Sequence, residues 1–252
     1  MTKHKIEGLI STLIPAIAIA FVLIASAPSV AQQSGSPPAQ NEQAASEPKY
    51  KPPSRGAPGG RVGGASRGTI RATLPLPTIE LLAPEGHAGL TTSPTPTLYF
   101  FVSQPITWPI QFTISAPARP NPLVEVNIPT PRQAGVYALR TADYRVRLES
   151  GVLYTWSVSV ILNPEARSRD IVASASLLRT VPDPAIESAL RGASASQRAV
   201  LLAQAGLWYD ALAAAADIKA FDRHALEALM NEVGLVEPAR YDRQTTGHDQ
   251  SR

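Results

Sequence analysis

Between residues 78 and 181 the sequence alternates between apolar and polar side chains, and this pattern constrains the fold more than any other feature of the chain. A period of two places alternate side chains on opposite faces of an extended strand, so one face of each run is suited to a core. The runs predicted as strands are 79–82, 97–102, 110–115, 124–128, 135–139, 154–160 and 171–178. Turn residues separate these runs, and about seven antiparallel strands are typical of a β-sandwich.

The last strand but one indicates the kind of sandwich. The segment from Leu148 to Val158 is similar to the corner and strand of immunoglobulin-like and fibronectin-type sandwiches, in which a tyrosine hydroxyl bonds back across the corner. Tyr154 is the predicted corner residue, and Trp156 follows on the same face of the strand. Aromatic residues on an alternating strand usually belong to the core, so both are predicted to be structural rather than to stack on a ligand.

After Val181 the apolar period changes from two to about 3.6, which predicts a helical unit over residues 182–236. Asp183 before Pro184 is a typical helix start, and Ser194 with Gln197 has the pattern of a capping box. Helices are predicted at 184–191, 195–205 and 207–220, with a fourth that begins at Asp222 and is closed by Gly234.

Residues 204–212 of this unit resemble the turn of a tetratricopeptide hairpin. A solenoid of such hairpins needs about three repeats to be stable, so a single hairpin is predicted to pack on the sandwich. Residues 237–252 are predicted to be a disordered tail. Together with the sandwich, predicted over residues 78–181, the helical unit defines the expected fold class as α+β.

Residues 1–31 have the features of a secretory signal peptide. Lys3 and Lys5 precede an apolar run from Leu9 to Ala25, and the small residues Ser29 and Ala31 precede the predicted cleavage site. The mature chain is therefore expected in the periplasm or outside the cell. The alternative is an uncleaved membrane anchor, for which an apolar run of 17 residues is short.

Residues 32–77 form a predicted arm rich in proline, glycine and arginine. Ten of the 21 residues from 48 to 68 are Pro or Gly, so the arm has too few apolar side chains for a core of its own. Arg55, Arg61 and Arg67 follow at intervals of six residues, which in a polyproline II helix places them on one face. This row of cations is predicted to bind an envelope protein or an anionic envelope polymer, and to affect association rather than folding. The alternative is that the arm lies along its own acidic sandwich.

The sequence offers little for catalysis or for cofactors. It has no cysteine, and its four histidines lack metal-ligand spacing, so no metal site is predicted. Residues 64–68 match the G-x-S-x-G pattern of hydrolases, but they do not follow the buried strand that such a nucleophile needs. The Gly-rich stretch 59–64 lacks the lysine of a P-loop, and the mature chain is nearly neutral, so no cofactor, nucleotide or nucleic acid is expected.

Two other places carry candidate binding residues. Arg167 and Asp170 lie in the turn between the last two predicted strands, where the pair either ties the turn down or contributes to an anion site. Trp108, beside Pro109 in a predicted loop, is the residue that a glycan-binding module would use.

Several short segments, taken in chain order, are similar to a known family. They are residues 50–58, 61–68, 81–84, 89–91, 94–100 and 163–170. Together they resemble the bacterial domain-of-unknown-function family 928 over about residues 50–235. Asn163 and Ala175 stand where an acidic and an aromatic residue are expected, which marks the chain as a divergent member. The resemblance implies export and carries no activity.

These features predict an exported, non-catalytic envelope protein that acts as a protein-interaction or structural module. A glycan- or peptidoglycan-binding module is the alternative, and a hydrolase is the least favoured class. The membrane is involved only if the signal segment is retained.

Overall fold

The structure is a computed structural model of the chain, and it describes residues 47–53, 59–63, 75–217 and 224–249, with the backbone alone for 245–249. The predicted signal segment lies outside these residues, as do Arg55, Arg67 and the G-x-S-x-G segment. None of the described helices is long and apolar enough to cross a membrane.

All seven predicted strands are present. They are β2 (Ile79–Leu81), β4 (Thr97–Val102), β5 (Ile110–Ser115), β6 (Val124–Ile128), β7 (Gly135–Arg140), β8 (Leu153–Val160) and β9 (Ile171–Arg179). Each agrees with its predicted range to within one residue at either end. The agreement is close because the alternation of apolar and polar side chains is a local property of the sequence.

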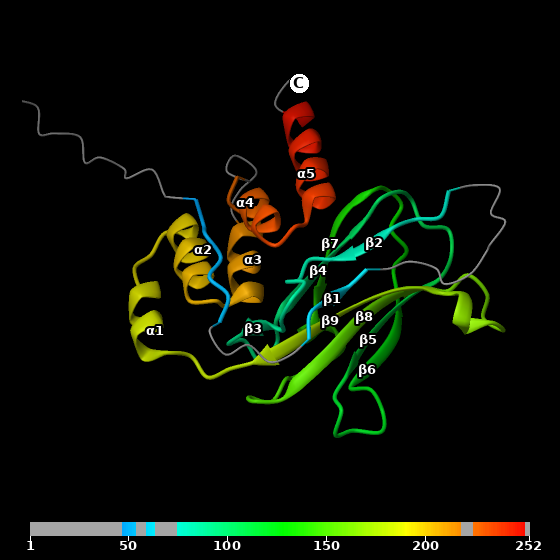
Figure 1. Ribbon diagram of the computed structural model, residues 1–252, viewed down its shortest axis with the longest axis horizontal. Coiled ribbons are helices and arrows are strands. Elements are labelled where there is room, and N and C mark those ends of the chain that lie inside the picture. Colours follow the sequence, from blue (N-terminus) through cyan, green and yellow to red (C-terminus); the bar gives the residue numbers. More distant parts are fainter. Residues whose placement is uncertain (1–46, 54–58, 64–74, 218–223, 250–252) are drawn as a thin grey trace, which may run out of the picture. The chain divides into compact units, whose positions relative to one another are not determined.

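The strands form two sheets that make a sandwich-like pair (Figure 1). The smaller sheet has the order β2-β4-β7, and the larger one contains β9-β8-β5-β6. Neighbouring strands in these two series run antiparallel. In the larger sheet, Trp156 of β8 lies between Ile114 of β5 and Ala175 of β9. The predicted α+β class and the sandwich-like arrangement of the sheets are confirmed.

Two short strands extend the larger sheet beyond β9. The strand β1 (Arg61–Val62) pairs with β9 antiparallel, whereas β3 (Gly89–Thr91) pairs with it in parallel. Sequence reasoning missed both, because β1 has only two residues and the buried positions of β3 are Gly89 and Thr91 rather than large apolar side chains. Through β1, part of the predicted arm joins the sandwich.

The core lies between the two sheets and is filled by alternate residues of their strands. Phe100, Phe112, Tyr154 and Trp156 are among its largest fully buried side chains. The backbone N–H of Glu149 donates a hydrogen bond to Oη of Tyr154 at 2.9 Å, which is the predicted bond across the corner. The structural assignment of Tyr154 and Trp156 is therefore confirmed.

The helical unit follows the strands. Its helices are α1 (Pro184–Leu190), α2 (Ala195–Gln204), α3 (Trp208–Ala216), α4 (His224–Glu232) and α5 (Val236–Asp249), and the short 3-10 helices η1 (Thr141–Tyr144) and η2 (Arg167–Arg169) lie between strands. The carboxylate of Asp183 caps α1, and Ser194 and Gln197 form a reciprocal capping box at α2, as predicted. Gly234 closes α4 with a positive φ of 75°, also as predicted. Asp222 lies outside the described residues.

The prediction of a disordered tail at residues 237–252 is wrong for its described part, which forms α5. This helix is mostly polar, so its sequence lacks the apolar period that identifies a helix. Tertiary contacts hold it: Asp242 is buried, and Arg243 pairs with Glu227 of α4. Ala239 is fully buried, and the ring of Tyr241 lies 5.6 Å from that of Phe101 on β4.

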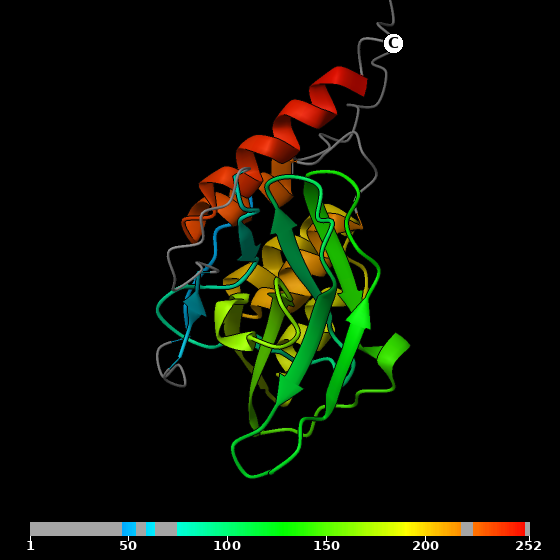
Figure 2. The same cartoon turned by 90° about the vertical axis from the view of Figure 1, so that its right-hand side faces the viewer.

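The helices lie on one side of the sheets (Figures 1 and 2), and α3 anchors them to the core. Its first two residues, Trp208 and Tyr209, are almost completely buried. Nε1 of Trp208 donates to the carbonyl of Leu82 at 2.9 Å, and Nε1 of Trp156 donates to Oη of Tyr209 at 2.8 Å. Gly89 permits this approach, because a Cβ there would lie only 2.5 Å from the ring of Tyr209. The prediction that the helical hairpin packs on the sandwich is confirmed.

The segment 47–53 of the predicted arm also packs on this body. Tyr50 is buried, its ring meets that of Trp208 edge-on at 5.0 Å, and its hydroxyl is 2.8 Å from Nε2 of His87. Burial raises the pKa of Tyr50 and lowers the pKa of His87, so burial favours the neutral form of both groups in this hydrogen bond. The packed body therefore begins before residue 78, the boundary placed from the sequence, because the arm contributes single anchor residues to a core formed elsewhere.

Candidate functional site

Arg61 is the one member of the predicted cation row that lies within the described residues. Its Nη1 is 3.0 Å from Oε1 of Glu80, and its side chain is only 8% exposed. The preceding residue, Gly60, lies against the backbone of Glu85: its φ is +151°, and an added Cβ would overlap the carbonyl oxygen of Glu85. Arg61 therefore lies along its own sandwich, the alternative to binding a partner. A partner-binding role for Arg55 and Arg67 stays a prediction.

Trp108 is half-buried and packs against the hydrophobic core. A side chain in this position supports the loop between β4 and β5 in the way a structural residue does. Contact of Trp108 with a glycan stays a prediction.

Arg167 and Asp170 form the predicted ion pair. Nε of Arg167 lies 2.5 Å from Oδ2 of Asp170, whose side chain is 2% exposed. Nη2 of the same arginine donates to Oε1 of Gln111 on β5 at 2.9 Å. The pair thus ties η2 to strand β5, which is the first of the two roles predicted for this turn. The other carboxylate oxygen of Asp170 is buried and has no hydrogen-bond partner among the described residues.

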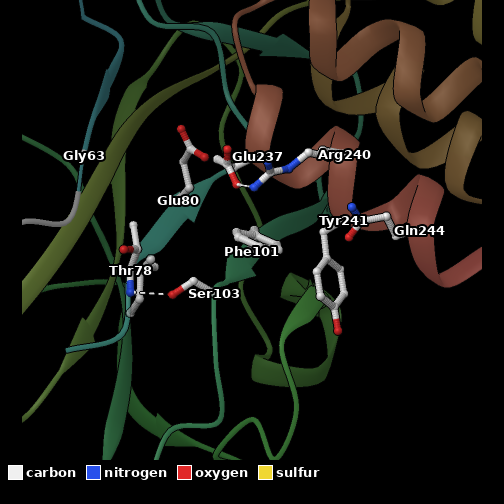
Figure 3. Close-up of a pocket in the computed structure, with 10 residues that line it drawn as sticks. Gly63, Thr78, Glu80, Phe101, Ser103, Glu237, Arg240, Tyr241 and Gln244 are labelled. Atoms are coloured by element: carbon white, nitrogen blue, oxygen red, sulfur yellow. Dashed lines mark hydrogen bonds and ion pairs between the residues drawn. The ribbon is translucent and has the colours of Figure 1, made fainter. Parts of the chain in front are cut away.

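A cleft of about 680 Å³ lies between the smaller sheet and α5 (Figure 3). Its lining residues are Gly63 after β1, Thr78, Ile79 and Glu80 at β2, Phe101 and Ser103 at β4, and Glu237, Arg240, Tyr241 and Gln244 on α5. Glu80 and Phe101 lie directly opposite each other in the β2–β4 pair and alternate with core residues, so both belong to the outer face of the sheet. The volume is within the range of about 300–1,000 Å³ that is usual for small-molecule sites.

The walls of the cleft are held by contacts between its own residues. The rings of Phe101 and Tyr241 are tilted by 60° and form an apolar wall between the sheet and the helix. At the other end, the backbone N–H of Thr78 donates to Oγ of Ser103 at 2.9 Å. Strands and a helix therefore supply the site, which makes it more rigid than a site formed by loops.

Two carboxylates and two guanidinium groups determine the electrostatics of the cleft. Glu80 pairs with Arg61 behind it, and Oε2 of Glu237 lies 2.5 Å from Nη2 of Arg240 on the exposed surface of α5. Burial raises the pKa of Glu80; Arg61 lowers it, and the negative charges of Glu237 and Glu85 raise it further. In Figure 3 the side chains of Glu80 and Glu237 extend toward the same part of the cleft.

Sequence reasoning did not identify this site. Glu80 lies in the run 79–82, which was predicted only as a strand, and residues 237–252, which include most of α5, were predicted to be disordered. Two weak signals exist in the sequence. One is a carboxylate within the apolar run 79–82, and the other is the spacing of Glu237 and Arg240, which is typical of an ion pair on a helix.

The cleft suits binding of a ligand that offers both donors and acceptors, because carboxylate, guanidinium, hydroxyl and amide groups meet there beside an apolar wall. No group of three or more histidine, aspartate or glutamate side chains that could hold a metal ion occurs in the described part of the chain.

Fold and site together define a sandwich-like α+β protein with a helical layer and a mixed polar cleft between them. The family model described as Domain of Unknown Function (DUF928) matches residues 62–241. The chain belongs to this family, as its sequence segments predicted. The matched range begins at the second residue of β1 and ends in α5, so it includes strands β2 to β9 and most residues of the cleft. No curated protein and no solved structure matches the chain.

Proposed function

We propose that the protein is an exported, non-catalytic component of the cell envelope that acts as an interaction or structural module and holds its partner at the cleft. The observation that carries this proposal is the construction of the cleft. Residues from the smaller sheet and α5, with Gly63 after β1, come together on one packed body, and the charges of Glu80 and Glu237 are already paired. A preformed site of this kind binds with little loss of conformational entropy.

We also infer that the sandwich is of the immunoglobulin or fibronectin type. In chain order, the first, second and fifth of the seven strands predicted from the sequence form one sheet, and the third, fourth, sixth and seventh belong to the other. Relative to the ABED and CFG sheets of a constant immunoglobulin domain, the arrangement differs only in the sheet that the fourth strand joins. The corner hydrogen bond of Tyr154 supports the same assignment. Such sandwiches are frequent in cell-surface proteins.

The geometry favours binding over hydrolysis at the cleft. A carboxylic acid that serves as a general acid must be protonated near the working pH. Burial raises the pKa of Glu80 and so favours its protonated form, but Arg61 at 3.0 Å favours the ionised form. Glu237 is an exposed member of an ion pair. The arrangement therefore suits fixed hydrogen-bond acceptors better than an acid and a base of different pKa.

Export is expected to remove residues 1–31 and to leave Gln32 as the first residue of the mature protein, because Ser29 and Ala31 match a peptidase site. Mass spectrometry of the protein from the envelope or the medium measures this directly. Recovery of the chain with residues 1–31 attached would contradict the signal peptide and favour a membrane anchor.

The binding role of the cleft can be tested by placing a photo-crosslinking amino acid at Gln244, which lines the cleft. A matched probe at Glu125, an exposed residue of β6 in the larger sheet, serves as the control. Illumination of intact cells is expected to give a covalent product from the first position and none from the second. Absence of a product at Gln244, or equal products at both positions, would contradict a partner at the cleft.

A further inference from the structure

The cleft combines free hydrogen-bond acceptors with donors. Arg61 occupies one oxygen of Glu80, and Arg240 occupies one oxygen of Glu237, which leaves the second oxygen of each carboxylate without a hydrogen bond from the described residues. Oγ of Ser103 accepts from Thr78, so its own proton remains available for donation. A ligand that suits these groups must itself donate and accept at neighbouring positions.

The charges of the cleft favour an uncharged ligand. Each of its two carboxylates has an arginine partner, so the formal charges cancel. An anionic ligand would meet the free oxygens of Glu80 and Glu237, while a cation would have to compete with guanidinium groups already in place. Both kinds of charged ligand are therefore disfavoured.

The apolar wall adds a second requirement. Tyr241 is half-buried and presents ring surface at the junction of sheet and helix, and the nearly buried ring of Phe101 supports it from the sheet. A ligand that satisfies both sides has hydroxyl groups along its edge and C–H groups on its face. A pyranose ring has this form, since each hydroxyl both donates and accepts while the ring carbons carry C–H groups on either face.

We propose that the cleft binds a neutral saccharide unit, with hydroxyl groups at Glu80, Ser103 and Glu237 and the apolar face of the sugar against Tyr241. The proposal rests on the proposed function, because it names the chemistry of the partner held at the cleft. It assigns saccharide contact to the cleft rather than to Trp108, which packs against the core.

The test is an NMR titration of the purified exported protein with trisaccharides. The neutral probes are the trimers of glucose, mannose, galactose and N-acetylglucosamine, and the charged probes are the cationic glucosamine trimer and the anionic galacturonate trimer. At least one neutral trimer is expected to shift the amide signals of Glu80, Ser103 and Tyr241. Both charged trimers are expected to bind about tenfold more weakly than this neutral trimer, a difference of about 1.4 kcal/mol in the free energy of binding. The glucosamine trimer differs from the N-acetylglucosamine trimer mainly in charge, so this pair isolates the electrostatic argument.

Two variants separate binding from folding. Tyr241→Ala is expected to weaken binding by about tenfold through loss of the ring surface. Glu237→Gln keeps the shape of an exposed side chain and removes its charge, so it is expected to weaken binding several-fold with an unchanged thermal midpoint. Glu187→Gln on exposed α1 is the matched control and is expected to bind like the unaltered protein. Full binding by Glu237→Gln would contradict the proposed contact.

Tighter binding of the cationic or anionic trimer, or no shift with any neutral trimer at millimolar concentration, would overturn the saccharide proposal. The proposed function has a separate readout. A covalent product between Gln244 and an envelope protein, without saccharide binding, would leave the interaction module intact and remove the saccharide as its ligand.

Discussion

Replacing Trp156 by alanine is expected to lower the free energy of unfolding by about 3–5 kcal/mol, the range for removal of a large buried aromatic side chain. Trp156 is fully buried, and its indole N–H donates to the hydroxyl of Tyr209. That hydroxyl in turn donates to the carbonyl of Ser176 at 3.3 Å. The substitution therefore opens a cavity at the place where the sandwich meets α3, and it removes one link of this chain of hydrogen bonds. Urea denaturation followed by circular dichroism measures the loss.

Two controls show whether the loss comes from the core. Trp108→Ala is expected to cost less than about 1.5 kcal/mol, because this tryptophan is only half-buried. Tyr209→Phe keeps the ring and leaves the N–H of Trp156 without its acceptor, which is expected to cost about 1–3 kcal/mol. Equal and small losses for Trp156→Ala and Trp108→Ala would mean that the register of β8 is wrong.

Replacing Arg61 by glutamine is expected to destabilise the protein by about 2–3 kcal/mol at pH 7. Removal of one member of a fully buried ion pair costs about 3–5 kcal/mol, and the value here is lower because Glu80 is 24% exposed. The sequence had predicted that the arginines of the arm affect association rather than folding. The position of Arg61 beneath the surface, paired with Glu80, makes this arginine part of the fold.

The effect of Arg61→Gln is expected to depend on pH. Burial already raises the pKa of Glu80 above its unfolded value, and loss of Arg61 raises it further, because this arginine is the group that lowers it. A carboxyl with a raised folded pKa destabilises the fold as the pH rises through the interval between its unfolded and folded pKa values. The variant should therefore differ little from the unaltered protein below about pH 4, and the difference should grow as the pH rises above that value.

Thermal denaturation at a series of pH values measures this dependence. The double variant Arg61→Gln with Glu80→Gln removes the unpaired charge, so it is expected to recover part of the lost stability. Its stability is also expected to change little relative to the unaltered protein between about pH 4 and pH 7, the interval above the ordinary pKa of glutamate. A loss in Arg61→Gln that is constant with pH would show that the packing of the arginine side chain, rather than its charge, stabilises the arm.

Much of the fold could be predicted because the information is local. The alternation around Trp156 identifies β8 and its buried face, and Ser194 with Gln197 marks the start of α2, since the capping groups lie within one turn of each other. The corner at Tyr154 could be inferred for the same reason, because the bonded groups are only five residues apart.

Elements without a local pattern could not be predicted. The helix α5 is polar almost throughout, and contacts with other elements hold it on the protein. Ala239 and Asp242 are buried, Arg243 pairs with Glu227 of α4, and Tyr241 contacts Phe101, a residue far away in the sequence. The strand β1 has two residues and exists because β9 offers it a free edge. Tertiary packing supplies the free energy that these segments lack by themselves.

By itself, the sequence determined seven of the strands, the starts of α1 and α2, the structural role of Tyr154 and Trp156, and the family, because each depends on residues close together in the chain. Only the tertiary structure decided where the charged residues of the cleft lie. It placed Arg61 against Glu80 rather than in solvent, and it brought Glu237 and Tyr241 to the outer face of β2 and β4. A cleft depends on which distant segments share one surface, and the register of the sheet and the packing of α5 determine that, rather than the spacing of residues along the chain.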